Sequence, residues 1–156
     1  MQTTPSRENA SRHTSVEKLQ AFLRSEISAV ETYELALKSV THVGLHRTLQ
    51  EILTSHGRRT AQLREKITAL GAIPEESSGV WGAFAKVFQA GADLLGERTA
   101  IGALEEGEDR SVEMYSADLK GCDTKTQKLV DSDLLPEQRR THDLCRTLKT
   151  YVTTPS

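Results

Sequence analysis

Apolar residues recur every three to four positions over four long stretches of the chain, the spacing expected for one buried face of an α-helix. The first stretch covers residues 14–40 and opens with Thr14-Ser15-Val16-Glu17, which predicts a capping box. The second covers residues 45–70 and is followed by Gly71, a residue typical of a helix end. We therefore expect two long helices separated by a short break.

The second half of the chain repeats this arrangement. A third apolar stretch starts near Gly96 and reaches Cys122. A fourth starts after Asp123, a good N-cap residue, and extends to about Val152. Pro136 interrupts it, and because proline has no backbone N–H, we expect a kink there.

A long connection, residues 72–95, separates the two halves. It opens with the polar, helix-breaking run 74–79, and then apolar residues that include Trp81, Phe84 and Phe88 recur at helical spacing. This pattern predicts a short amphipathic helix lying across the bundle. Its polar side lacks the row of Lys and Arg typical of membrane-surface helices, so we expect packing or a dimer contact.

Length and charge limit the remaining possibilities. A chain of 156 residues forms one domain, predicted over 14–152, with a disordered tail over 1–13. The formal net charge of −2 provides no basic field for nucleic acid or an anionic membrane, so neither is expected as a partner. No secretory signal or long apolar run is present, which predicts a soluble, cytoplasmic protein. Cys122 and Cys145 are expected to be reduced, partly buried thiols.

The two halves also resemble each other residue by residue. The pattern Glu-x4-Glu-x-Tyr-x3-Leu-Lys starts at Glu26 and again at Glu108. Farther along each half, His56 follows a serine and His142 follows a threonine. Two related helical hairpins joined by a long crossover can form a four-helix bundle.

Ionisable residues occupy the apolar faces of these predicted helices. At about 100° per residue, Glu26, His56 and Glu108 each point along the middle of an apolar stripe, whereas His142 lies about 70–80° from the centre of its stripe. A buried carboxylate must be neutralised, paired or bound to a cation. A divalent metal, a shared proton, a His⁺–Glu⁻ pair and an inward-reaching arginine all remain open as solutions.

The same residues resemble a known superfamily. The segments Glu26–Tyr33 and Glu108–Tyr115 are similar to the first and third helices of the rubrerythrin branch of the ferritin-like superfamily, and residues 15–150 are similar to a bacterial ferritin-like family of unknown function. The resemblance implies an all-α, ferritin-like four-helix bundle of two hairpins, with 72–95 as the crossover. It also implies metal binding, in a role related to iron or stress.

One departure from that resemblance bears on the site. Metal-active members carry Glu-x-x-His on the second and fourth helices, whereas here Leu53 and Arg139 stand where the two bridging glutamates belong. The resemblance therefore implies at most a reduced site.

Two functional readings follow. In the first, Glu26, His56, Glu108 and His142 hold one divalent ion, Fe, Mn or Zn, with Glu105 as a further candidate ligand.

In the second, the bundle is a metal-free structural or interaction module, and Arg139 supplies the positive charge in place of a metal. We expect a homo-oligomer, most simply a dimer, in either case. The sequence does not decide whether the protein is an enzyme.

Overall fold

The computed structural model describes the backbone of residues 6–79 and 82–154, and the side chains of these ranges except 82–95. The expected contact residues Trp81, Phe84 and Phe88 therefore have side chains outside the described part. In chain order the elements are α1 Arg7–Ser39, α2 Val43–Ala69, α3 Gly82–Ser116, α4 Thr124–Leu129, the π-helix η2 Val130–Leu134, and α5 Leu135–Thr153.

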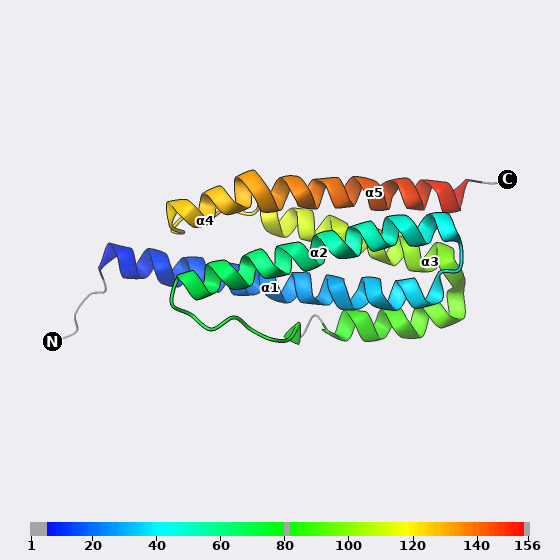
Figure 1. Ribbon diagram of the computed structural model, residues 1–156, viewed down its shortest axis with the longest axis horizontal. Helices are drawn as coiled ribbons and strands as arrows, with labels where there is room; N and C mark the ends of the chain where they lie inside the picture. The colour runs from blue at the N-terminus through cyan, green and yellow to red at the C-terminus, as the bar shows by residue number, and fades with distance from the viewer. Residues whose placement is uncertain (1–5, 80–81, 155–156) are drawn as a thin grey trace.

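The long helices form a bundle of two hairpins (Figure 1). α1 and α2 make the first hairpin, and α3 with the α4–η2–α5 rod makes the second. α1 packs against α2 and α3, and α5 packs against the same two helices, so each long helix has two neighbours. This arrangement confirms the all-α bundle predicted from the apolar periodicity.

The start of α1 differs from the expected boundary. The helix begins at Arg7, seven residues before Thr14, and the Ser6 side chain accepts a hydrogen bond from Asn9 N at 3.3 Å. The Thr14 hydroxyl lies inside the helix and donates to Ala10 O at 3.1 Å. The predicted capping box was therefore wrong, and residues 7–13, predicted to be disordered, extend α1.

Glycines with positive φ end α2 and divide α3. Gly71 follows α2 with φ 78°, and Ala72 N donates back to Ile67 O, which confirms the predicted helix end. Gly96 lies inside α3 with φ 79° and ψ 179°, a backbone conformation almost confined to glycine. The chain changes direction there (Figure 1), so that residues 97–116 form the third bundle helix, which starts where the sequence predicted and ends six residues before the expected Cys122.

The fourth rod is irregular near its middle. Asp123 caps α4 by accepting a hydrogen bond from Thr126 N at 2.9 Å, as expected. The irregularity expected at Pro136 takes the form of the π-helix η2, which ends two residues before that proline. A π turn contains more residues than an α turn, so η2 rotates the side chains that follow it about the helix axis.

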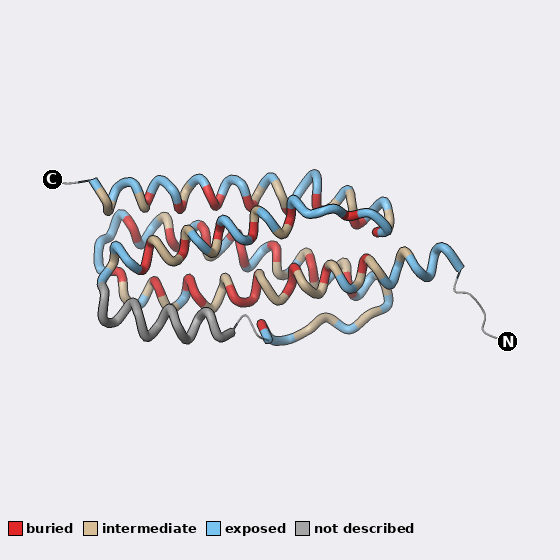
Figure 2. Tube along the Cα trace, turned by 180° about the vertical axis from the view of Figure 1, so that it is seen from behind, coloured by how far each residue is buried: buried red, intermediate tan, exposed pale blue. Residues whose placement is uncertain are grey.

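Buried residues line the inward faces of the helices (Figure 2) and form two apolar clusters. One lies toward the α1–α2 turn and includes Leu49, Ile101 and Cys145. The other lies toward the opposite end and includes Leu19, Leu63, Ile67, Cys122 and Val130. Both cysteines are free and buried. Between the two clusters, every long helix contributes buried polar side chains to a central layer.

None of the described helices combines the length and apolar character needed to cross a bilayer.

Candidate functional site

Three of the four predicted site residues meet in the central layer. His56 on α2 lies between the carboxylates of Glu26 on α1 and Glu108 on α3. The distance from His56 Nδ1 to Glu26 Oε2 is 2.6 Å, and that from His56 Nε2 to Glu108 Oε1 is 2.9 Å. All three residues are at most 2% exposed. The inward orientation predicted for these residues is therefore found in the structure.

The two repeated tyrosines bind these carboxylates crosswise. Tyr33 on α1 donates to Glu108 Oε1 at 2.7 Å, and Tyr115 on α3 donates to Glu26 Oε1 at 2.6 Å. Burial and the neighbouring Glu108 raise the pKa of Tyr33 well above its ordinary value, and burial and Glu26 do the same for Tyr115. Both phenols therefore stay protonated and serve as hydrogen-bond donors.

Arg59 is the central residue that the sequence analysis missed. It is fully buried, and its Nη1 lies 3.5 Å from Glu26 Oε1. Its Nη2 lies 2.9 Å from His56 Nδ1. Its Nε has no hydrogen-bond partner among the described residues. One signal in the sequence points to it: Arg59 stands one turn after His56 and so shares its side of the helix.

Arg139 does not have the role suggested for it. It is exposed and lines a surface groove with Tyr115, Asp118 and Gln127. The second reading was therefore wrong about the identity of the arginine, because Arg59, not Arg139, supplies the guanidinium beside Glu26.

α5 contributes neutral side chains to the centre. Gln138 Nε2 donates to Glu108 Oε2 at 2.6 Å, and Thr141 Oγ1 donates to the same oxygen at 3.0 Å. Arg59 in turn donates to Gln138 Oε1 and, at 3.3 Å, to Thr141 Oγ1. Each of the four carboxylate oxygens of Glu26 and Glu108 therefore has at least one partner within the protein.

The charges of this centre compensate one another. Burial alone would raise the pKa of Glu26, but Arg59 and His56 outweigh it and lower that pKa below 4.5. Likewise burial would raise the pKa of Glu108, and His56 with Tyr33 brings it below 4.5. Burial would lower the pKa of His56, yet Glu26 and Glu108 raise it above 6.5 despite the nearby Arg59. The two carboxylates thus face the Arg59 guanidinium and the His56 ring, whose protonated form they favour.

These residues do not fit the metal pair of ferritin-like enzymes. Such a pair needs inward Glu-x-x-His on the second and fourth helices. The pairs that face this centre are His56-x-x-Arg59 on α2 and Gln138-x-x-Thr141 on α5. A guanidinium beside a carboxylate repels a dication from the same oxygens, and the neutral amide and hydroxyl are weak ligands.

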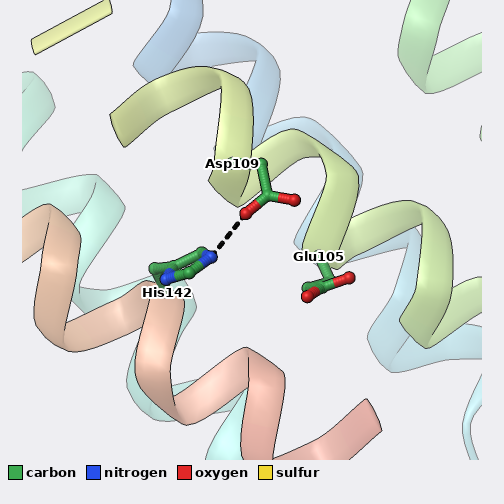
Figure 3. Close-up of side chains that lie close together, drawn as sticks. All are labelled: Glu105, Asp109 and His142. Atoms are coloured by element: carbon green, nitrogen blue, oxygen red, sulfur yellow. Dashed lines mark hydrogen bonds and ion pairs between the residues drawn. The ribbon is translucent and has the colours of Figure 1, made fainter. Parts of the chain in front are cut away.

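His142 lies apart from the other three predicted ligands. Its Nε2 is 2.5 Å from Asp109 Oδ1, and its side chain is 11% exposed. Glu105 lies one turn before Asp109 on α3 and faces the same space (Figure 3). One ligand atom from each of these three residues lies within 4.8 Å of the other two. The sequence pointed to His142 and Glu105 but placed them at the centre rather than in this flank cluster of Glu105, Asp109 and His142.

A small pocket between α1 and α3 reaches the centre. Its volume is about 40 Å³, and Tyr33, His56 and Glu108 form its inner end. Its walls are mostly small residues: Ser25, Ser28, Ala29, Thr32, Gly107 and Ser111. A space of this size accommodates water molecules, whereas pockets for organic substrates usually have volumes of several hundred Å³.

Comparisons with known proteins place the chain within a family. The family model described as "Domain of unknown function (DUF2383)" matches residues 14–121, which is more than half of the chain. The match spans α1, α2 and α3 and ends before α4. Neither the search of curated proteins nor the search of solved structures found a match.

Proposed function

We propose that this chain, which belongs to the DUF2383 family, works as a non-enzymatic structural or interaction bundle whose central acids are neutralised by protein cations and not by a metal. The observation that carries the proposal is the position of Arg59. Its guanidinium is fully buried, 3.5 Å from Glu26 and 2.9 Å from His56. It supplies at this point the positive charge that a metal ion would otherwise contribute.

The shape of the centre supports the absence of an activity there. Catalysis at a metal requires an open coordination position, and catalysis on an organic substrate requires space beside the reacting groups. Here the carboxylate oxygens are hydrogen-bonded to Tyr33, Tyr115 and Gln138. The adjoining pocket of about 40 Å³ accommodates only a few waters.

Replacing the buried arginine tests the role of its charge. Arg59→Met leaves two buried carboxylates with His56 as the only titratable cation beside them among the described residues, and removing one partner of a buried ion pair typically costs about 3–5 kcal/mol. We expect a loss of this size in the free energy of unfolding, measured by urea denaturation. The matched control is Arg58→Met, because Arg58 is the exposed neighbour on the same helix, and we expect a change within about 0.5 kcal/mol. Equal stabilities of the two variants would contradict the proposal.

Metal analysis tests the other half of the proposal. The untagged chain is loaded with Fe²⁺ or Zn²⁺, dialysed, and compared with Glu26→Gln by elemental analysis. We expect the two proteins to retain the same amount of metal, because the carboxylate oxygens of the centre already have partners within the protein. Metal that is lost only on changing Glu26 would restore the first reading, in which the central residues are ligands.

The proposal keeps the predicted homodimer as the working assembly. A bundle without an activity of its own acts through its surface, and a symmetric dimer is the commonest assembly of soluble proteins. Light scattering on the full chain, which gives the mass directly, checks it: a mass of two chains supports the dimer, and a mass of one chain rules it out.

A further inference from the structure

A second cluster of potential ligands lies on the seam between α3 and α5, away from the hydrogen bonds of the centre. Glu105 and Asp109 are four residues apart on α3, so their side chains lie on one face of that helix. His142 approaches them from α5 (Figure 3). We propose that Glu105, Asp109 and His142 form a binding site for a divalent transition-metal ion, which goes beyond the proposed function of the bundle.

The separations suit a metal after small shifts of the side chains. Carboxylate oxygens and imidazole nitrogens bind Zn²⁺ at about 2.0–2.2 Å, so two ligand atoms on one ion are about 3–4 Å apart. The candidate atoms here all lie within 4.8 Å of one another. His142 Nε2 and Asp109 Oδ1, now 2.5 Å apart, must separate, and the longer separations must shorten, when an ion enters.

The environment of the histidine supports the same role. Metal-binding histidines usually present their second ring nitrogen to a carboxylate or carbonyl, which fixes the ring and its tautomer. His142 points Nε2 toward Asp109, and its Nδ1 lies 3.7 Å from Asp143 Oδ1. Asp143 is thus in position to orient the ring, as a positioning residue outside the coordination shell.

The charges on this seam favour an added cation. Glu105, Asp109 and Asp143 carry three negative charges, and Lys149 provides the facing ammonium, hydrogen-bonded to Glu105. The Lys149 side chain is 43% exposed, so it can leave Glu105 for water when an ion binds. Lys149 therefore competes with the metal for one ligand.

The ligand set defines the class of ion. One imidazole and two carboxylates suit Zn²⁺, Fe²⁺ or Mn²⁺, whereas Mg²⁺ and Ca²⁺ prefer oxygen ligands throughout. The Asp109 side chain is 53% exposed, which leaves room for water in the remaining coordination positions.

Calorimetric titration of the untagged full chain with Zn²⁺ tests the inference. We expect one ion per chain for the wild type, and affinity weakened by about 100-fold or more in His142→Gln. Asp143→Ala, which removes only the orienting carboxylate, should weaken binding by about 10–100-fold. Lys149→Met should strengthen binding, because it frees Glu105. The matched control, His46→Gln, changes an exposed histidine on α2 and should leave the affinity unchanged.

The outcomes separate this inference from the proposed function. If His142→Gln binds Zn²⁺ as tightly as the wild type, or if Lys149→Met weakens binding, the flank site is wrong and the metal-free centre stands. If Glu26→Gln abolishes binding while His142→Gln retains it, both ideas fail. Thermal unfolding followed by circular dichroism accompanies each variant, so that a lost affinity is read only from folded protein.

Discussion

At the scale of single residues, the central problem is how two buried carboxylates remain ionised side by side. Each is stabilised by several partners: Glu26 by hydrogen bonds with His56 and Tyr115 and an ion pair with Arg59, and Glu108 by hydrogen bonds with His56, Tyr33 and Gln138. Removing a partner from such a group exposes the full cost of its desolvation, which is larger than the net gain from forming the bond. Removing a single one of these partners should therefore lower the free energy of unfolding more than a substitution of similar size on the surface.

The tyrosine hydroxyls give a matched test of this expectation. Tyr33→Phe and Tyr115→Phe each remove one donor to a buried carboxylate without changing the ring, and hydrogen bonds to charged groups contribute about 1.5–3 kcal/mol. We expect each variant to lose stability within that range in urea denaturation. Tyr151→Phe is the control, because Tyr151 is 60% exposed and touches neither acid. Phe variants as stable as the control would show that the hydroxyls do not stabilise the carboxylates.

At the scale of elements, the internal duplication explains the crosswise contacts. α1 and α3 carry the same Glu-x6-Tyr spacing, and each tyrosine reaches the glutamate of the other helix. The second and fourth rods are less alike, because η2 precedes α5 and has no counterpart in α2. We attribute to this π turn the inward position of Gln138 and Thr141 and the flank position of His142.

At the same scale, the backbone conformation of Gly96 within α3 can be tested by substitution. An added Cβ would meet no atom within 4 Å there, so the cost of Gly96→Ala comes from its φ of 79° and ψ of 179° alone. Such a conformation costs about 1–3 kcal/mol for a residue with a side chain, and we expect that loss in the free energy of unfolding.

The comparison variant for Gly96 comes from the same helix. Gly102 lies in regular α3, and its added Cβ is also free of contacts, so Gly102→Ala should stabilise the protein by about 0.5–1 kcal/mol. If the free energy of unfolding falls in Gly96→Ala and rises in Gly102→Ala, the result supports the turn at Gly96. A Gly96→Ala variant more stable than the wild type argues against it.

At the scale of the whole molecule, the centre is a polar layer between two apolar clusters, and every long helix contributes to it. The free energy of unfolding of the whole bundle therefore includes the contribution of this layer. Since its members titrate, that contribution depends on pH.

The pKa shifts decide whether the contribution of the layer to stability rises or falls with pH. The pKa values of Glu26 and Glu108 are lowered on folding, so their contribution is present above pH 4.5 and is lost as the pH falls through the folded values. The pKa of His56 is raised, so its contribution is complete below pH 6.5 and is lost as the pH rises through the folded value. The layer should stabilise the bundle most between these limits.

Urea denaturation over a pH series measures this dependence. We expect the wild type to lose stability on both sides of the window. His56→Gln removes the group responsible on the alkaline side, so its stability should vary less with pH above 6.5 than that of the wild type. Parallel profiles above pH 6.5 would mean that His56 is not protonated in the folded state.

The helices and the inward orientation of the acids could be predicted from the amino-acid sequence. Apolar periodicity is a local property, so it located the bundle helices, and Gly71, Gly96 and Asp123 marked their ends through backbone preferences that act within one turn. The same periodicity turned Glu26, His56 and Glu108 inward, because a residue within an apolar stripe follows the stripe to the core.

The residues that surround those acids could be identified only from the packing of the helices. Partners such as Arg59 and Gln138 come from different helices, and their approach depends on how the helices pack and on the rotation introduced by η2. Arg59 was missed because a charged residue one turn from a stripe is usually solvated, and only a carboxylate on a neighbouring helix makes its burial favourable. The periodicity had already put His142 at the edge of its stripe, and helix packing decided that the acid it meets there is Asp109.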